Sequence, residues 1–302
     1  MKERYVAKNF RPATLDLIEI CEGILNDYAA DGYDLTLRQL YYQLVSRDII
    51  PNSQKEYSRL GSIVNDARLA GLLDWEQIVD RGRKTVENSH WTDPSAILRS
   101  AAASFAIDKW EAQPYYVEVM CEKQALEGVL APVCERLDIP FSSNKGYSSQ
   151  SFMWRKGKNL LRKVRRGKEI LLLYLGDHDP SGLDMDRDIK DRLSMFVGNS
   201  DRLHVENLDL NRVALTMDQI EEFNPPPNPA KITDSRAKEY IKKHGDESWE
   251  LDALEPRILA ALVEDAVFGV RDEDLWMEAL AKEQAMTESL KGLADEYKDK
   301  EW

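Results

Sequence analysis

Two aspartates in the middle of the chain have a spacing suited to binding a cation. Asp177 and Asp179 directly follow the apolar run Ile170–Leu175, in the sequence Leu-Tyr-Leu-Gly-Asp-His-Asp-Pro-Ser-Gly. Residues i and i+2 of an extended chain point the same way, and Mg²⁺ binds one or two carboxylates together with water and phosphate. The pair therefore predicts a Mg²⁺ site. Acids at this spacing also occur in sugar-nucleotide transferases and phosphatases, and as helix caps.

Glu122 is the third acid of this predicted site. It ends the strand predicted at Tyr115–Cys121 and opens the next helix. If that strand neighbours Ile170–Leu175, all three acids meet at the carboxyl edge of a parallel sheet, where ligand sites lie. A third acid suits a catalytic metal or a general base, and a charge facing the helix dipole is its alternative role. Glu118 lies inside the same strand and is predicted to be half-exposed, so Glu122 is the better candidate.

The elements around these acids alternate between strands and helices. Strands are predicted at 115–121, 139–143, 170–175, 203–211 and 213–215, and helices at 123–137, 151–166 and 181–197. This order predicts an α/β fold with a Rossmann-like parallel sheet and helices on both faces. A proline-rich loop is predicted at 224–229. The chain from residue 233 on is predicted to be a mostly helical extension with an acidic amphipathic tail.

The segment before the sheet has a helical pattern. A helix is predicted over 13–30, and a capping box of Thr36 and Gln39 opens a second helix. A third helix ends at Gly71, and a short strand and wing are predicted over 72–83. Helix, helix and wing together predict a winged helix-turn-helix that binds DNA. The predicted domains are an N-terminal helix at 1–30, the winged helix at 31–90, a connector with a helix at 94–109 within 91–112, and the sheet domain with its extension at 113–302.

The second helix contains two adjacent tyrosines. Tyr41 falls on the apolar stripe and is predicted to be buried, whereas Tyr42 lies about 100° around the helix and is predicted to be accessible. Arg38 is four residues before Tyr42 and shares its face. A phenol needs activation to attack a phosphate, and a guanidinium could favour the phenolate and bind the phosphate. Of the two tyrosines, Tyr42 is therefore the one that could react, with Arg38 beside it; packing against a partner domain or stacking on DNA is the alternative role of Tyr42.

These motifs together resemble those of a known family. Cys-Glu-Lys-Gln-Ala-Leu-Glu-Gly-Val-Leu, then Asn-Lys-Gly-Tyr, then Gly-Asp-His-Asp-Pro-Ser-Gly-Leu-Asp resemble, in this order, the Toprim domain of the topoisomerase VI A-subunit and meiotic double-strand-break family. The resemblance covers residues 115–190 well and the winged-helix region fairly. Arg-Gln-Leu-Tyr-Tyr at 38–42 resembles the family's Arg-x-x-Tyr-Tyr motif, whose second tyrosine attacks DNA. The resemblance, together with the helical pattern, makes Tyr42 the candidate nucleophile and Arg38 its helper.

The resemblance implies a function. Glu122, Asp177 and Asp179 would hold Mg²⁺, and Tyr42 would break double-stranded DNA by transesterification and allow rejoining without ATP. A homodimer is implied, in which the tyrosine of one chain works with the metal of its twin. An ATPase subunit is a weaker expectation, because the family's topoisomerases bind it through an N-terminal arm longer than the segment before Tyr42. The alternatives are a Toprim nuclease that uses water, a non-catalytic DNA-binding module and a sugar-nucleotide transferase.

The charge of the chain is unevenly distributed. A formal net charge of −13 over 302 residues does not suggest a nucleic-acid binder. The segment Arg155–Lys168 is nevertheless strongly basic and could bind phosphates locally, with a solvated helix face as the alternative. The predicted DNA contacts are Lys123, Lys145, Arg155, Arg162, Arg165 and Arg166.

The remaining composition favours a cytoplasmic, nucleoid-associated protein. No apolar run is long enough to span a membrane, and the charged N-terminus has no apolar stretch after it, which argues against a secretory signal. The three cysteines form no Cys-x-x-Cys pair. This usage fits a reducing compartment and argues against a zinc ribbon.

Overall fold

A parallel sheet lies at the centre of the computed structural model, which describes residues 2–79, 88–143, 148–198 and 208–298. Its four strands have the order β2-β1-β3-β4. They are β1 (Tyr115–Cys121), β2 (Phe141–Ser143), β3 (Glu169–Leu175) and β4 (Leu208–Ala214). β1 and β3 pair in register from Tyr115 opposite Glu169 to Cys121 opposite Leu175. The predicted adjacency of these two strands is confirmed, and the fold is mixed α/β.

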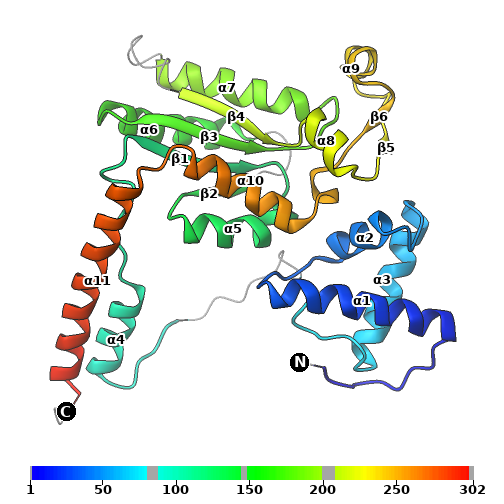
Figure 1. The fold of residues 1–302 in the computed structure, drawn as a ribbon, viewed down its shortest axis with the longest axis horizontal. Coiled ribbons are helices and arrows are strands. Elements are labelled where there is room, and N and C mark those ends of the chain that lie inside the picture. The colour runs from blue at the N-terminus through cyan, green and yellow to red at the C-terminus, as the bar shows by residue number, and fades with distance from the viewer. Residues whose placement is uncertain (1, 80–87, 144–147, 199–207, 299–302) are drawn as a thin grey trace.

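Helices cover both faces of the sheet (Figure 1). One face is covered by α6 (Gln150–Arg165) and α7 (Gly182–Gly198), and the other by α5 (Glu127–Arg136) and α10 (Pro256–Phe268). Alternate residues of each strand point to opposite layers, so Leu172 packs with α6 and α7 while Leu173 packs with α5 and α10. Burial on both faces explains why β3 is a continuous apolar run rather than an alternating one.

Three helices form a separate core at the N-terminal end, in blue and cyan in Figure 1. They are α1 (Pro12–Ala30), α2 (Leu37–Ser46) and α3 (Gln54–Leu69). The capping box of Thr36 and Gln39 opens α2 as predicted. The predicted strand and wing at 72–83 differ from the structure. Over the described part, 72–79, the only bridge is an isolated one between Leu35 and Ile78, and residues 80–83 lie outside the described ranges.

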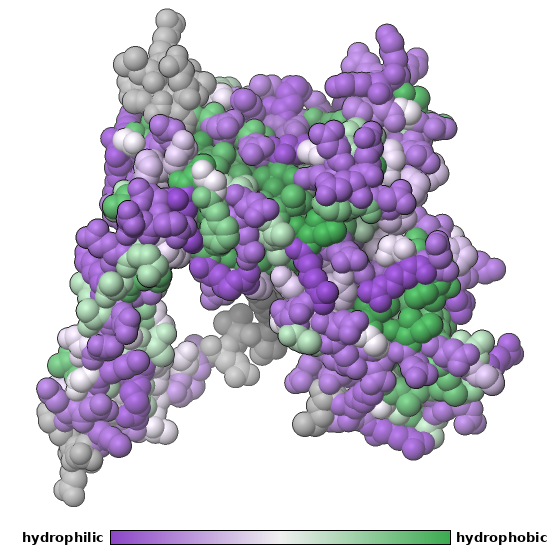
Figure 2. Space-filling model, in the orientation of Figure 1, coloured by the Kyte–Doolittle hydropathy of each residue, from purple (hydrophilic) through white to green (hydrophobic). Residues whose placement is uncertain are grey.

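A long helical arm extends from the sheet. It pairs α4 (Pro94–Ser104) with α11 (Glu273–Glu296), two segments far apart in sequence (Figure 1). The helix predicted to continue to residue 109 ends at Ser104, because Phe105 is extended and the Ile107 N–H donates to Glu283 of α11 at 2.9 Å. Figure 2 shows polar side chains over most of this arm and apolar ones gathered over the sheet layer.

The other elements lie near the carboxyl ends of the strands. They are 3₁₀ turns at Gln124–Leu126 and Leu251–Ala253, α8 (Met217–Phe223), α9 (Ala237–His244), and the antiparallel pair β5 (Asn228–Pro229) and β6 (Glu247–Ser248). β5 falls in the predicted proline-rich loop. The two strands predicted at 203–211 and 213–215 are one strand, β4, where they are described; residues 203–207 are outside. Of the helices described, none has the length and apolarity needed to cross a membrane.

Candidate active site at the carboxyl edge of the sheet

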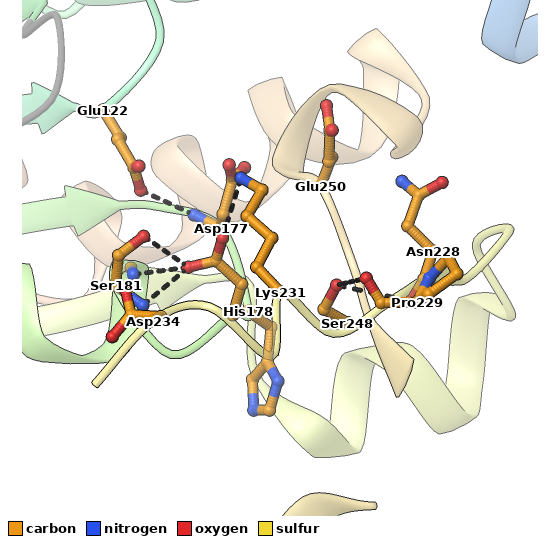
Figure 3. Close-up of polar contacts among 12 residues, drawn as sticks. Glu122, Asp177, His178, Ser181, Asn228, Pro229, Lys231, Asp234, Ser248 and Glu250 are labelled. Carbon is orange, nitrogen blue, oxygen red and sulfur yellow. Dashed lines mark hydrogen bonds and ion pairs between the residues drawn. The ribbon is translucent and has the colours of Figure 1, made fainter. Parts of the chain in front are cut away.

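Glu122 and Asp177 follow neighbouring strands at the point where the strand order reverses. β1 has β2 on one side and β3 on the other, so the crossover from β1 leads to one side and the next, from β2, returns past β1 to its other side. Open parallel sheets bind ligands at such switch points. The backbone N–H of Asp177 donates to Oε2 of Glu122 at 2.9 Å (Figure 3). The structure thus brings these two predicted site residues together.

Burial is the main perturbation of both carboxyl groups, and neighbouring charges modify it. Burial, then the nearby carboxylates of Asp177 and Asp179, raises the pKa of Glu122 to about 7. Burial also raises the pKa of Asp177, although Lys123 and the Leu251 N–H oppose that shift. A divalent cation at this edge would relieve the repulsion between the carboxylates.

Asp179 caps a helix. Its Oδ1 accepts hydrogen bonds from the Ser181 N–H and Oγ, both at 2.9 Å, and from the Gly182 N–H at 2.6 Å. Its Oδ2 lies 3.5 Å from Nζ of Lys231. This is the cap role that the sequence left open beside metal binding. His178 points away from the carboxylates (Figure 3), with Nδ1 2.9 Å from the Tyr240 hydroxyl.

The acids fit Mg²⁺ in type but are not gathered around one point. Within the described ranges, no group of three or more His, Cys, Asp or Glu side chains is arranged to hold a metal ion. Carboxylate oxygens are the ligands that Mg²⁺ prefers. Glu122 uses Oε2 for the Asp177 N–H, and Asp177 uses Oδ1 for Lys123 and the Leu251 N–H. The second oxygen of each enters no hydrogen bond among the residues described, so it would be the one to meet a cation.

A second pair of acids, which the sequence reasoning missed, surrounds Lys123. The Lys123 ammonium lies 3.0 Å from Asp177 Oδ1, 2.9 Å from Glu250 Oε2 and 2.7 Å from Asp252 Oδ1. These acids raise the pKa of Lys123 despite its burial. Burial alone would raise the pKa of Glu250, but Lys123 and Arg38 lower it to about 2. The only signal was the spacing of Glu250 and Asp252, again i and i+2.

Arg38 of α2 contacts the same acid pair. Its Nε lies 2.8 Å from Asp252 Oδ2, and its Nη2 forms an ion pair with Glu250. The same guanidinium donates to the Tyr42 hydroxyl at 3.4 Å and lies 5.7 Å from the centre of the Tyr42 ring. Arg38 and Tyr42 therefore share a face as predicted. A chain of contacts joins Tyr42, Arg38, the acid pair, Lys123 and Asp177.

Tyr42 is buried, so the prediction that it is accessible is wrong. It is 5% exposed, because the segment around Glu250 packs over α2. It lines a pocket of about 190 Å³ together with Arg38, Asn52 and Asn228. Burial, then Asp252 and Glu250, raises the pKa of Tyr42 to about 12 and outweighs the opposing effect of Arg38. The predicted activation by Arg38 is therefore not the net effect here, because burial and the two carboxylates outweigh it.

Tyr41 is buried, as predicted, and has a structural role. Its hydroxyl accepts a hydrogen bond from the Ser53 N–H at 2.7 Å and donates to Oδ1 of Asn52 at 3.0 Å. These bonds fix the turn between α2 and α3. Tyr41 is thereby distinguished from Tyr42, whose hydroxyl has only the 3.4 Å contact with Arg38 among the described residues.

Arg212 of β4 holds the loop that carries the aspartates. Its guanidinium donates to the carbonyl oxygens of Gly176 at 3.1 Å, Asp177 at 3.3 Å and Gly182 at 2.7 Å. Its Nε also lies 2.9 Å from Asp186 Oδ2. Arg212 therefore fixes both ends of the turn between β3 and α7. The sequence carried no signal for it beyond one arginine in a predicted strand.

Glu118 is fully buried, which corrects the prediction of half exposure. It is 5% exposed because α6 covers its side of β1. Lys156 of α6 forms an ion pair with it, and the Tyr116 hydroxyl donates to it at 3.0 Å. A parallel strand is covered on both faces, so a polar residue within it finds a buried partner instead of solvent.

The predicted DNA contacts have different surroundings. Arg155, Arg162, Arg165 and Arg166 are exposed on α6 or at its end. Lys123 is held by the three carboxylates described above. Lys145, with the rest of the Asn-Lys-Gly-Tyr motif, lies outside the described residues. No protein-family model and no curated protein matches this chain.

Proposed function

We propose that this chain breaks and rejoins double-stranded DNA as a homodimer, in the manner of a topoisomerase VI A-subunit. The observation that carries the proposal is the meeting of Glu122 and Asp177 at the switch point of a parallel sheet. The order of the motifs around them supports it. In this proposal the N-terminal helices are a winged-helix domain, the sheet is a Toprim domain, and Asp179 is the third Mg²⁺ ligand.

The proposed reaction is a transesterification. The Tyr42 oxygen bonds to phosphorus while the bond from phosphorus to a sugar oxygen breaks, and that oxygen gains a proton as Tyr42 loses one. Bound Mg²⁺ would stabilise charge on the phosphate and the leaving oxygen. Arg38 would bind the phosphate and favour the phenolate once Glu250 and Asp252 no longer hold it. Reversal needs no ATP, because the phosphotyrosyl link retains the energy of the broken bond.

Hydrolysis by water is the second candidate, and specific observations favour it. Tyr42 is buried, and its pKa is raised to about 12, which disfavours its attack. The pKa of Glu122 is raised to about 7, in the range suited to a general base at neutral pH. A Toprim nuclease would use Glu122 to activate water beside Mg²⁺ and leave Tyr42 without a chemical role.

A supercoiled-plasmid assay distinguishes the two reactions. The protein is incubated with plasmid and MgCl₂, stopped with SDS, and split into samples with and without protease. Transesterification predicts nicked or linear DNA that stays bound to protein until proteolysis and is absent for Tyr42→Phe. Hydrolysis predicts free ends that persist in Tyr42→Phe and disappear in Glu122→Gln. Retained DNA binding with no cleavage under any condition would favour a binding module.

Tyr41→Phe is the matched control for the nucleophile. It removes a hydroxyl from the adjacent residue and leaves the Ser53 N–H without its acceptor. We expect it to lower the free energy of unfolding by about 1–2 kcal/mol while cleavage persists. Tyr42→Phe should unfold at nearly the wild-type urea concentration. Equal loss of cleavage in both variants would argue that Tyr42 acts through the fold rather than through its oxygen.

A further inference from the structure

The basic segment of α6 divides into buried and exposed side chains. Lys156 pairs with the buried Glu118, and Lys168 donates to the carbonyl oxygens of Trp110 at 2.8 Å and Glu111 at 2.7 Å. These lysines are accounted for by the fold. The arginines of the segment are on the outside: Arg155, Arg162, Arg165 and Arg166. The basic segment therefore places positive charge on the surface of α6.

An exposed tryptophan lies on the same helix face as two of these arginines, Arg162 and Arg165. Trp154 is 50% exposed, although tryptophan is mostly buried in folded proteins. Trp154, Lys158, Arg162 and Arg165 follow one another at i, i+4, i+8 and i+11, which places them in one stripe along the helix. At 1.5 Å per residue the stripe is roughly 17 Å long.

A pocket of about 580 Å³ opens beside Trp154. It is lined by Gln150, Ser151, Trp154, Arg155 and Phe196. Phe196 of α7 is fixed there because α6 comes very close at Gly157, where an added Cβ would lie 2.6 Å from Phe196 Cβ. The pocket thus combines two aromatic rings with a guanidinium, next to a row of positive charge.

We propose that α6 binds single-stranded DNA, with an unpaired base stacked on Trp154 and the phosphates following the arginine stripe. Base stacking on aromatic side chains along a basic surface is how single strands are bound without sequence preference. A duplex keeps its base faces within the stack and cannot present one to Trp154. The stripe is locally positive on a chain of net charge −13, and a local row of positive charge favours a polyanion over a neutral surface as its partner.

The position of α6 connects this surface to the candidate active site. The helix begins at the carboxyl edge of the sheet, after β2, and ends before β3 starts at the opposite edge. Trp154 lies about one turn into the helix, toward the carboxyl edge of the sheet where Glu122 and Asp177 lie. A strand separated at the carboxylates could therefore continue along α6. The inference takes its ligand class from the proposed function but involves no cleavage step.

Binding to a labelled oligo(dT), measured by fluorescence anisotropy in low salt without Mg²⁺, tests the proposal. We expect Trp154→Ala to weaken binding by about 5- to 150-fold, which corresponds to the loss of one stacked base, and Trp154→Phe to retain most of it. Binding to a duplex of equal length should change little. Arg162→Ala should weaken oligo(dT) binding and reduce its salt dependence. Trp91→Ala is the control, since Trp91 is 47% exposed but far in sequence from the basic stripe.

Several results would overturn the proposal. The proposal fails if the wild-type protein does not bind oligo(dT), or if Trp154→Ala binds it as well as wild type does. It also fails if Trp154→Ala loses single-strand and duplex binding to the same extent. A change of molecular mass in solution for Trp154→Ala, with unchanged oligo(dT) binding, would assign the face to a second copy of the chain instead. Tyr42→Phe should bind oligo(dT) normally, so a failure of the cleavage proposal remains distinguishable from a failure here.

Discussion

Nε of Arg38 lies 2.8 Å from Oδ2 of Asp252, so a side chain of the N-terminal helices forms an ion pair with a turn next to the sheet. The Asp252 side chain is only 1% exposed and also binds Lys123 through its other oxygen, at 2.7 Å. Asp252 therefore lies between Arg38, the proposed helper of Tyr42, and Lys123, the residue after Glu122. The two halves of the candidate site are linked by this carboxylate and Glu250.

Replacing this link should destabilise the protein. Asp252→Asn removes a buried charge that is shared by Arg38 and Lys123, and we expect it to lower the free energy of unfolding by about 1–3 kcal/mol. Urea denaturation measures the change. Glu264→Gln is the control, because its pair with Arg136 is exposed and should contribute less than about 0.5 kcal/mol. Equal effects of the two substitutions would contradict a special role for Asp252.

Glu122 should make stability depend on pH. Its pKa is raised from 4.5 to about 7 on folding. Below pH 4.5 the carboxyl is protonated in both states and carries no penalty. Between these two pKa values the Glu122 carboxyl ionises only in the unfolded state, so the free energy of unfolding falls as the pH rises. The total loss reaches about 3 kcal/mol above pH 7. Glu122→Gln should therefore be more stable than wild type at pH 8, and the difference should vanish near pH 4.5.

Thermal unfolding of both proteins across this pH range measures the effect. The Gln variant retains an oxygen that can accept the Asp177 N–H, so the comparison isolates the charge. MgCl₂ at pH 8 should raise the melting temperature of wild type more than that of Glu122→Gln, because a cation at the carboxylates stabilises the folded state. An identical shift in both would place Mg²⁺ elsewhere. A constant difference between the proteins at all pH values would contradict the raised pKa.

Local patterns predicted the sheet better than the site. The apolar run of β3 and the capping box of α2 could be predicted, because each depends on residues close together in the sequence. The adjacency of β1 and β3 followed from the rules for parallel sheets. The burial of Tyr42 and Glu118 could not be predicted from the sequence. Residues 250–252 cover Tyr42 and α6 covers Glu118, and both lie far from these residues in the chain. Helix periodicity gives the face of a side chain but not what lies against that face.

The buried pair of Glu118 and Lys156 gives a further test. Both side chains are 7% exposed and contact each other between β1 and α6. Lys156→Met should lower the free energy of unfolding by about 3–5 kcal/mol, because it leaves the Glu118 charge buried without a partner. The double variant Glu118→Gln with Lys156→Met should recover part of that loss. Chemical denaturation of wild type, the two single variants and the double variant checks this, and a double variant as unstable as the sum of the two single ones would contradict it.

Two helical glycines should respond oppositely to alanine. An added Cβ at Gly182 would lie 2.2 Å from the Asp177 carbonyl oxygen, whereas at Gly292 in α11 it would meet nothing within 4 Å. Gly292→Ala should stabilise the protein by about 0.5–1 kcal/mol through helix propensity. Gly182→Ala must displace the turn that holds Asp177 and Asp179, so it should lower the melting temperature and abolish any Mg²⁺-dependent rise. Calorimetry with and without MgCl₂ measures both effects, and a stable Gly182→Ala variant would mean that this turn can shift without affecting the carboxylates.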